Sequence, residues 1–377
     1  MASNVCVLTT AHGFLDVRAY FTQVRTLASG GYYVRYIAKD VSGDNDSTLV
    51  PNVERCPIKP YSSRLLRMFL GSIHAFILAL QSKASIYHFH DPELIPVCIV
   101  LKLLNGKRVI YDVHELVESQ ILSKKWIPYL FLRRVIAAVY SIVEKIGMYF
   151  FDKVILAEDD YLNFYKKKYF DLRKFEIIHN YPIASLAAPV LSPKKENNPK
   201  VLIYAGALAE ERGIADIVRA VELISEPIEL WLVGTWADEN FHKYCESLPG
   251  YSKVRYLGFL PLDEVYRLIS RADIGLSMLH PIGNYLTSYP TKVFDYMLHS
   301  KPAVMSNFPL WKSVFNGAVL FAIPQNPEDI ALKIQTLLNN APLRSELGET
   351  GRNLIETKYS WEKEGLRLLQ LYKSLET

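Results

Sequence analysis

The sequence predicts an α/β protein made of two doubly wound domains, each built on a parallel sheet. Short apolar stretches typical of strands alternate with longer amphipathic stretches typical of helices along the whole chain. Strand candidates such as RVIYD (residues 108–112) and KVILA (residues 153–157) are continuously apolar rather than alternating, which indicates strands covered on both faces. The chain has 377 residues, 50% of them apolar, so it is long enough for two domains with separate cores.

The first domain is expected over residues 1–180. Its predicted strands are residues 4–9, 32–39, 86–90, 108–112 and 153–157, and its predicted helices are residues 17–29, 64–81, 94–104 and 126–151. The alternation then stops, and a stretch rich in Pro, Ala, Ser and Lys predicts a linker over residues 181–199.

The second domain is expected over residues 200–359. Its predicted strands are residues 201–205, 229–233, 254–257, 274–279, 302–306 and 318–321, with helices between them. We expect the last helix, residues 360–377, to join the first domain. In sheets of this kind ligands bind beyond the carboxyl ends of the strands, so the expected site lies in the cleft between the domains.

Composition narrows the class of protein. A charged fraction of 22% rules out a disordered or fibrous chain, and a net charge of +4 does not favour nucleic acid as a partner. The four cysteines are far apart and form no CxxC pair, which predicts reduced thiols and a cytoplasmic location. No signal-peptide pattern precedes the first strand, and charges interrupt the nearest approach to a membrane-spanning stretch, residues 129–151.

Two segments of the second domain are suited to bind a phosphate. In YAGALAEERGI (residues 204–214), Gly206 ends a strand and Arg212 lies where a helix begins. In SYPTKVFDYM (residues 288–297), Lys292 lies in the first turn of a predicted helix, where an anionic ligand would explain a cation. Asp295 on that helix is placed to accept hydrogen bonds from a ribose diol. Each segment also fits an ordinary βα turn with solvated charges.

Two neighbouring strands of the first domain end in histidines and carboxylates. The segments are IYHFHDPE (residues 86–93) and VIYDVHE (residues 109–115). The HxH spacing places both imidazoles on one face of a strand, which raises the possibility of a metal site. No HExxH or similar ligand pattern is present, so hydrogen-bonded structural histidines are the favoured interpretation and no required metal is predicted. The first strand is not followed by GxGxxG, which disfavours a nicotinamide dehydrogenase.

In their order along the chain, several segments resemble the retaining glycosyltransferases of family 4, which have the GT-B fold. They are HFHDPEL, VIYDVHE, YAGALAEERGI, YLGFLP, SYPTKVFDYM and KPAVMSNFPLW, and they extend over nearly the whole chain. The resemblance implies two Rossmann-like domains that face each other across a cleft. Within the family, the set is most similar to bacterial enzymes that build surface polysaccharides.

The resemblance implies a donor site in the second domain. Arg212 matches the basic residue that grips the donor diphosphate, and Lys292 lies where a second cation or the adjacent backbone does so. Asp295 matches the second acid of the family's Glu-x7-Glu pattern, which holds the ribose hydroxyls. The segment Leu257–Pro261 matches the loop that borders the nucleobase, with Leu257 and Gly258 as the candidate contacts.

The resemblance also implies contacts from the first domain. His114 matches the histidine that approaches the transferred sugar, and Gly13, in the loop after the first strand, matches the glycine that lets the backbone approach the diphosphate. The remaining substrate-binding candidates are His90, Asp91, Glu93, Gly206, Thr287 and Ser288. The sequence departs from the family at Thr287, where the first acid of the Glu-x7-Glu pattern is expected, and at Ala207, where an arginine is common.

The implied reaction moves a hexosyl or N-acetylhexosaminyl group from a nucleotide sugar, with UDP favoured over GDP, to a glycan or polyprenyl-linked acceptor with retention. Arg212 and Lys292 would stabilise the departing diphosphate and His114 would position the sugar, which makes these three the catalytic candidates. No cofactor is expected beyond the donor substrate. Alternatives are a nucleotide-sugar epimerase or a sugar phosphorylase on the same fold, and a non-catalytic nucleotide-sugar-binding protein.

The first domain is also expected to dock on the inner face of the cell membrane. Residues 1–180 carry 23 Lys and Arg against 17 Asp and Glu. Residues 62–80 and 124–151 mix basic side chains with large apolar ones, a composition that suits an anionic lipid surface. The same segments also fit helices packed on a sheet, with solvated cations at their ends.

Overall fold

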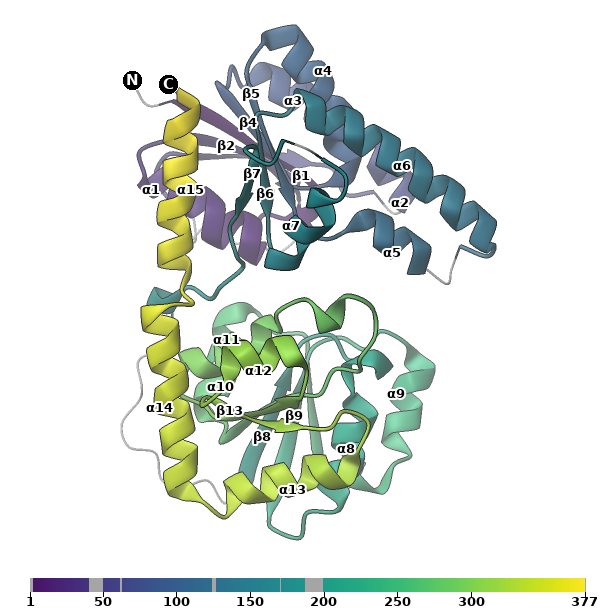
Figure 1. Cartoon of the computed structure of the whole chain (residues 1–377), viewed down its shortest axis with the longest axis vertical. Helices are drawn as coiled ribbons and strands as arrows, with labels where there is room; N and C mark the ends of the chain where they lie inside the picture. The colour runs from purple at the N-terminus through teal and green to yellow at the C-terminus, as the bar shows by residue number, and fades with distance from the viewer. Residues whose placement is uncertain are drawn as a thin grey trace. The chain divides into compact units, whose positions relative to one another are not determined.

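The computed structural model describes residues 3–40, 50–61, 63–123, 127–169, 171–186 and 199–376. The chain divides into two compact units (Figure 1). The first is Met1–Asn180 together with Glu364–Thr377, and the second is Tyr181–Lys363. Each unit is an α/β domain on a parallel sheet, which confirms the predicted fold class.

The sheet of the first unit has seven strands in the order β3-β2-β1-β4-β5-β6-β7. They are β1 (Asn4–Gly13), β2 (Tyr33–Lys39), β3 (Val53–Ile58), β4 (Ile86–Phe89), β5 (Arg108–Val113), β6 (Lys153–Leu156) and β7 (Phe175–Ile177). The five predicted strands all form, and β3 and β7 are additions at the two edges. The strand order reverses between β1 and β4, and the carboxyl ends at such a switch point are the usual ligand site.

The predicted helices of the first unit also form, with some changes of geometry. Residues 17–29 comprise a π-helical stretch, η1 (Val17–Val24), followed by α1 (Arg25–Ser29). The helix over residues 64–81 is α2 (Arg64–Leu66), the π-helical η3 (Arg67–Gly71) and α3 (Ser72–Gln81). The others are η4 (Pro92–Leu94), α4 (Ile95–Asn105), α5 (Val117–Ser123), α6 (Leu130–Phe150), α7 (Asp159–Lys166) and α15 (Trp361–Glu376).

Helices cover both faces of the first sheet. One face packs on α3, α4 and α6 through a core that includes Phe89, Tyr111 and Cys98. On the other face, Tyr372 of α15 donates to or accepts from Nδ1 of the buried His88 at 2.7 Å, so the last helix belongs to this unit. Gly30 lies against Leu369 of the same helix.

The sheet of the second unit has six strands in the order β10-β9-β8-β11-β12-β13. They are β8 (Lys200–Ala205), β9 (Ile228–Val233), β10 (Val254–Gly258), β11 (Ile274–Ser277), β12 (Ala303–Ser306) and β13 (Val319–Ala322), and all six lie where the sequence predicts. The remaining elements are η5 (Ala184–Leu186), η6 (Glu210–Arg212), α8 (Ile214–Glu222), α9 (Glu239–Glu246), η7 (Pro249–Lys253), α10 (Leu262–Arg271), η8 (Gly283–Leu286), α11 (Thr291–Leu298), α12 (Pro309–Phe315), α13 (Pro327–Leu338) and α14 (Ala341–Thr357).

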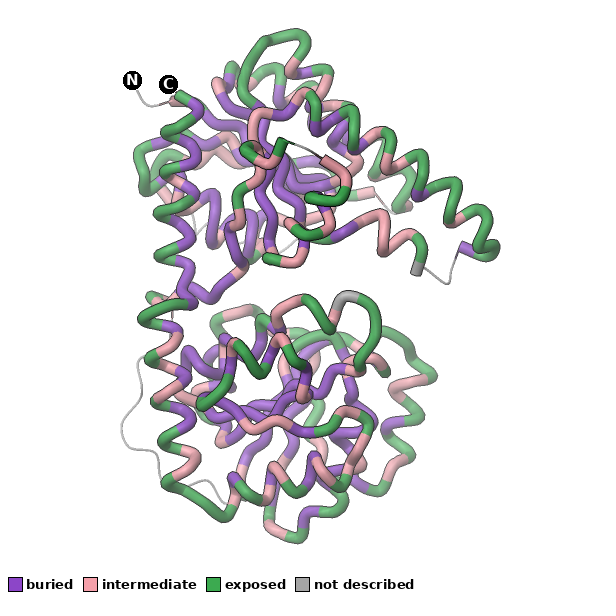
Figure 2. The backbone as a smooth tube through the Cα atoms, in the orientation of Figure 1, coloured by how far each residue is buried: buried purple, intermediate pink, exposed green. Residues whose placement is uncertain are grey.

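Two buried cores flank the second sheet. Its strands are mostly buried (Figure 2). The expected linker begins inside this unit, because Tyr181 packs its ring 5.1 Å from that of Phe294 and joins the core beside α11. Of the predicted linker, residues 187–198 lie outside the described residues. Burial of an aromatic ring therefore ties the start of this segment to the second unit.

Candidate functional site

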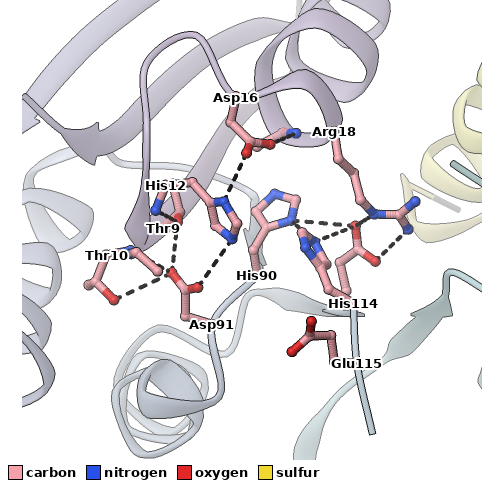
Figure 3. A network of polar contacts seen from close by, with 12 residues as sticks. Thr9, Thr10, His12, Asp16, Arg18, His90, Asp91, His114 and Glu115 are labelled. Carbon is pink, nitrogen blue, oxygen red and sulfur yellow. Dashed lines mark hydrogen bonds and ion pairs between the residues drawn. The ribbon is translucent and has the colours of Figure 1, made fainter. Parts of the chain in front are cut away.

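Asp112 lies at the centre of a polar network at the carboxyl ends of β1, β4 and β5. Figure 3 shows the surrounding residues of this network, among them Arg18, His90 and His114. The carboxylate is fully buried and accepts two hydrogen bonds from Arg18, at 2.7 Å from Nη2 and 3.1 Å from Nε. Gln23 also donates to it. Burial acts to raise the pKa of Asp112, but the Arg18 guanidinium and His114 lower it well below its ordinary value. Asp112 is therefore an ionised anchor for the residues around it.

Two histidines that the sequence singled out meet on this anchor. Nδ1 of His90 lies 2.8 Å from Nε2 of His114, and both nitrogens lie 3.4 Å from Asp112. Burial lowers the pKa of His90, so this ring is neutral at pH 7. The pairing orients the His114 ring, which is 19% exposed and can reach a ligand.

A metal ion fits this network poorly. His88, His90 and Asp112 place one potential ligand atom each within 4.8 Å of one another. The Arg18 guanidinium already binds both oxygens of the Asp112 carboxylate, however, and brings a positive charge to the place where a cation would sit. The arrangement favours an ionised Asp112 carboxylate whose charge is balanced by Arg18 and which positions the histidines.

Asp91 shapes the end of β1. Its Oδ2 accepts hydrogen bonds from the Thr9 hydroxyl at 2.7 Å, from the Thr10 amide at 2.6 Å and from the Ala11 amide at 3.1 Å. Glu93 accepts from the Thr10 hydroxyl at 2.9 Å. Asp91 thus holds the backbone of β1 in place and Glu93 holds the Thr10 side chain, while both acids also line the cavity described below and remain predicted substrate ligands.

Gly13 is the last residue of β1, not part of a loop after it as the sequence suggested. The strand continues beyond residue 9 because its backbone regains pairing with β2 at Gly13, opposite Lys39. The Gly13 carbonyl accepts hydrogen bonds from the Tyr36 hydroxyl at 3.1 Å and from the Asp16 amide at 3.2 Å.

His12 is a site residue that sequence reasoning missed. Its Nδ1 lies 2.8 Å from Asp16, and its Nε2 lies 3.7 Å from Asp91 (Figure 3). Burial acts to lower the pKa of His12, but the two carboxylates outweigh it and raise the pKa to about 9. The ring is thus a cation at pH 7, and the signal for it was the His-x3-Asp spacing in TTAHGFLDVR.

A cavity of about 260 Å³ opens beside this network. Its walls carry His12, Arg64, Arg67, His90 and His114, and the acids Asp91, Glu93 and Glu115. The cationic and imidazole side chains give the cavity donors for an oxygen-rich ligand. It lies entirely within the first unit.

In the second unit, Lys292 and Gly206 lie against each other. Lys292 is in the first turn of α11, is 9% exposed and has its Nζ 4.6 Å from the centre of the Tyr204 ring. Gly206 follows β8 with a φ of +138°, and a Cβ there would stand 3.3 Å from Cε of Lys292. A glycine at this position therefore leaves room for the lysine.

Lys292 lacks the partner that a buried cation needs. Among the described residues its Nζ makes no hydrogen bond or ion pair within the usual distances. Burial together with Arg212 lowers its pKa to about 7, against the opposing effect of the Asp295 carboxyl. A buried cation without a counter-ion is costly, so an anionic ligand at this position would be strongly favoured.

Arg212 stands near Lys292 at the turn before α8. Its guanidinium lies 4.7 Å from the centre of the Tyr285 ring. The next residue, Gly213, has a φ of +72°, and a Cβ there would stand 1.8 Å from the Met278 carbonyl oxygen. Only glycine fits, so the turn carrying Arg212 is held against the carboxyl end of β11.

Asp295, one turn along α11, is already engaged within the protein. The Tyr266 hydroxyl donates to its Oδ1 at 3.0 Å, a contact that the sequence did not suggest. Burial raises the pKa of Asp295 to about 7, against the opposing effects of Tyr266 and Lys292. The predicted ribose ligand is therefore a half-buried carboxyl with one oxygen bound to a tyrosine.

The other candidates of the second unit lie at the same edge of its sheet. Leu257 and Gly258 end β10, and Gly258, with a φ of +71°, accepts a hydrogen bond from the Gly234 amide at 2.8 Å. Thr287 and Ser288 lie between η8 and α11, where the Ser288 carbonyl accepts from Trp311 at 2.8 Å.

Comparisons with known proteins agree with this architecture. Residues 191–354 match the family model of glycosyl transferases group 1. The chain is 24% identical over 187 residues to the uncharacterized glycosyltransferase MJ1607 of Methanocaldococcus jannaschii, covering 47% of this chain and 46% of that protein. It is 24% identical over 266 residues to the probable glycosyltransferase WbjE of Pseudomonas aeruginosa, covering 67% and 64%. The matches thus span about half to two thirds of these relatives.

Solved structures match over nearly the whole chain. Sucrose-phosphate synthase from Thermosynechococcus elongatus has a TM-score of 0.77 at 16% identity, covering 100% of this chain and 99% of that one. Anabaena Alr3699/HepE in complex with UDP and glucose has a TM-score of 0.73 at 13% identity, covering 99% and 100%. The chain therefore has the two-domain α/β fold of GT-B glycosyltransferases, and its second unit carries the match to glycosyl transferases group 1.

Proposed function

We propose that this protein is a retaining glycosyltransferase that moves a sugar from a nucleotide-sugar donor to a glycan or lipid-linked acceptor. The observation that carries the proposal is the buried, unpartnered Lys292 beside Gly206 and Arg212, within the segment that matches glycosyl transferases group 1. Two cations at the carboxyl ends of parallel strands suit a diphosphate, because its negative charge would serve as the counter-ion for Lys292.

The donor diphosphate would bind to Arg212 and Lys292. As the bond between the sugar and the diphosphate breaks, negative charge grows on the leaving group, and two cations held in place stabilise it without reorganisation. Front-face attack with retention would let the leaving phosphate accept the acceptor proton, so no carboxylate nucleophile is assigned. Asp295, bound to Tyr266, would accept a hydrogen bond from the ribose.

The nucleobase would lie against the turn at Leu257 and Gly258. Gly258 has a positive φ, which favours glycine, and because glycine has no side chain a base can approach the backbone there. We favour UDP over GDP, and the solved relative Alr3699/HepE, described in complex with UDP and with UDP-glucose, supports this choice. His114, oriented by His90 and Asp112, would position a hexosyl or N-acetylhexosaminyl group.

The acceptor would enter the cavity of about 260 Å³ in the first unit. Its cationic His12 and neighbouring arginines suit an acceptor with phosphate or many hydroxyl groups. A role in bacterial surface-polysaccharide synthesis follows from the motif resemblance. It is supported by a similarity in fold, with a TM-score of 0.61, to the lipopolysaccharide outer core galactosyltransferase WaaB.

The test is release of nucleoside diphosphate from a panel of UDP- and GDP-sugars, with and without lipid-linked and free glycan acceptors. Release that requires an acceptor supports transfer, and a product with the anomeric configuration of the donor supports retention. Conversion of donor without acceptor would instead indicate an epimerase, and consumption that depends on inorganic phosphate a phosphorylase. Nucleotide binding without any turnover would leave a non-catalytic binding protein.

Lys292→Met tests the carrying observation, because methionine keeps the length of the side chain and removes its charge. We expect nucleoside diphosphate affinity to fall by about 10-fold to 100-fold, the loss of one charge-assisted contact. Lys333→Met is the matched control, since Lys333 lies on α13, is paired with Asp329 at 3.8 Å and belongs to neither of the segments that carry Arg212 and Lys292. Equal affinity of the Lys292 and Lys333 variants would refute the donor site.

A further inference from the structure

Large apolar side chains are exposed together on one surface of the first unit, as the described residues show. This surface is formed by the outward sides of the helix over residues 64–81, of α4 and of α6, which lie side by side on one face of the sheet (Figure 1). We call it the apolar face and define it by six side chains that are each more than 60% exposed: Leu65, Phe69, Leu103, Phe131, Ile142 and Tyr149. Exposed positions continue along the length of α6 (Figure 2).

The helix over residues 64–81 has its small residues inside and its large apolar residues outside. Its buried positions are Gly71, Ser72, Ala75 and Ala79. By length and composition this is the one helix among the described residues that could cross a membrane. Only 22% of its residues are buried inside the protein. A helix facing water shows the opposite pattern, with large apolar side chains inside and polar ones outside.

The α6 helix repeats this inverted pattern. It meets α4 through Gly147, where a Cβ would stand 2.8 Å from Ile95. Its acid, Glu144, is buried and accepts hydrogen bonds from the hydroxyls of Tyr140 and Tyr165, both at 2.8 Å. Burial raises the pKa of Glu144. The helix thus hides its carboxyl group and exposes its apolar side chains.

The exposed charges on the three helices that form the apolar face are all positive, although Asp171 lies beside Lys145 and Tyr149 at the edge of this face. Arg64, Arg134 and Lys145 are exposed on these helices. The three helical segments contain no other Asp or Glu than Glu144, which faces inward. Tyrosines stand near both ends of α6, with Tyr129 72% exposed and Tyr149 80% exposed. Tyrosine rings of this kind favour the boundary between lipid and water.

We infer that the apolar face rests in the surface of an anionic lipid bilayer. The large apolar side chains would enter the acyl boundary while the arginines and lysine meet anionic headgroups. Because α3 packs into the core through Ala75 and Ala79, its helix lies along the membrane surface and does not cross it. A second copy of the chain is a poorer occupant, since pairing two such faces would bring like charges together.

The inference also bears on the acceptor, and this step rests on the proposed function. Arg64 and Arg67 belong to the helix that presents the apolar face, and both line the cavity that holds His12. A lipid-linked acceptor could therefore keep its hydrocarbon chain in the bilayer while its polar head enters the cavity. Membrane binding itself needs no transfer reaction and is measured without a sugar donor.

The test is co-sedimentation of the full chain with vesicles of phosphatidylcholine alone or mixed with phosphatidylglycerol. We expect binding to require the anionic lipid and to weaken as salt rises, because salt screens charges beyond about 10 Å at 0.1 M. Absence of binding to anionic vesicles at low salt would overturn the inference. Binding that is equal with both lipids and unaffected by salt would overturn the role given to the cations.

A matched pair of variants locates the surface. Leu103 on the apolar face is 64% exposed, and Leu366 on α15 of the same unit is 63% exposed. Leu103→Glu should weaken vesicle binding by about tenfold or more, whereas Leu366→Glu should not change it. Equal effects of the two variants would contradict the assignment, as would a homodimer that Leu103→Glu dissociates in the absence of any vesicle binding.

The cations are tested in the same way. Arg134→Gln with Lys145→Gln should weaken binding to anionic vesicles and reduce its salt dependence, while Lys373→Gln on α15 should leave both unchanged. Circular dichroism of each variant separates loss of binding from loss of folding. Because the nucleotide site is in the second unit, these variants should bind nucleoside diphosphate as the wild type does. Unchanged vesicle binding by Arg134→Gln with Lys145→Gln would overturn the role given to these cations.

Discussion

The depressed pKa of Lys292 makes nucleotide binding depend on pH in a specific way. Its pKa is about 7 in the free protein because burial, and secondarily Arg212, disfavour the charged form. A bound diphosphate supplies the missing counter-charge, so binding takes up a proton whenever the lysine starts out neutral. The affinity should then approach a tenfold fall for each pH unit above 7, which amounts to about 50-fold between pH 7 and pH 9.

The assay is titration calorimetry with UDP between pH 7.5 and pH 9, a range in which the terminal phosphate, with a pKa near 6, is already ionised. Lys292→Met should bind more weakly and show a flat profile over this range. Asp295→Asn separates the contribution of the neighbouring carboxyl, whose pKa is raised to about 7. A flat profile in the wild type would refute the reasoning, because it would mean that Lys292 is charged before nucleotide arrives.

The same lysine gives a second measurement that needs no nucleotide. Its pKa is lower in the folded state than the ordinary 10.5, so the unfolded chain binds more protons between pH 7 and pH 10.5. The free energy of unfolding should therefore rise with pH across this window. Lys292→Met removes this contribution, and the difference between wild type and variant in urea unfolding at pH 7 and pH 9 isolates it.

Three further predictions concern stability, each measured by urea unfolding. Gly213→Ala should cost about 3 kcal/mol or more, since its Cβ would strike a carbonyl oxygen at 1.8 Å, whereas Gly106→Ala, with a similar φ and open space, should cost about 1 kcal/mol. Arg18→Met should cost about 3–5 kcal/mol because it leaves the buried Asp112 unpaired, and a loss under 1 kcal/mol would contradict the role of the pair. The pKa of His12 is raised to about 9, so its contribution to the free energy of unfolding is fully present below about pH 6.5 and is lost as the pH rises through 9. The destabilisation caused by His12→Gln should therefore shrink between pH 6 and pH 10, and a constant effect would oppose this.

Most of the secondary structure could be predicted from the sequence, and the two missed strands show the limit. Central strands such as β5 and β8 are continuously apolar because both faces are buried. β3 contains Pro57 and several polar residues, and β7 has only three residues. Both lie at the edges of the sheet, where one side of the strand needs no partner and the pattern is weak.

The candidate site divides in the same way. The position of Arg212 and Lys292 after strands of a doubly wound sheet follows from their order in the chain. The pairing of Arg18 with Asp112, 94 residues apart, could not be predicted, nor could the hydrogen bond from Tyr266 to Asp295. These contacts depend on which side chains meet once the strands are ordered, and pattern along the chain does not contain that information.

By itself, the sequence determined the alternation of strands and helices, the division into two domains and the strand ends at which ligands are expected. Hydrophobic periodicity and turn-forming residues depend on only a few neighbouring positions, so they can be recognised in a single sequence. Only the tertiary structure decided the protonation of the groups at those ends, the cationic His12 and the half-protonated Lys292, and the inward orientation of Glu144 on α6. Burial and the distances between charges set the energy of a titratable group, and both exist only after distant segments have packed together.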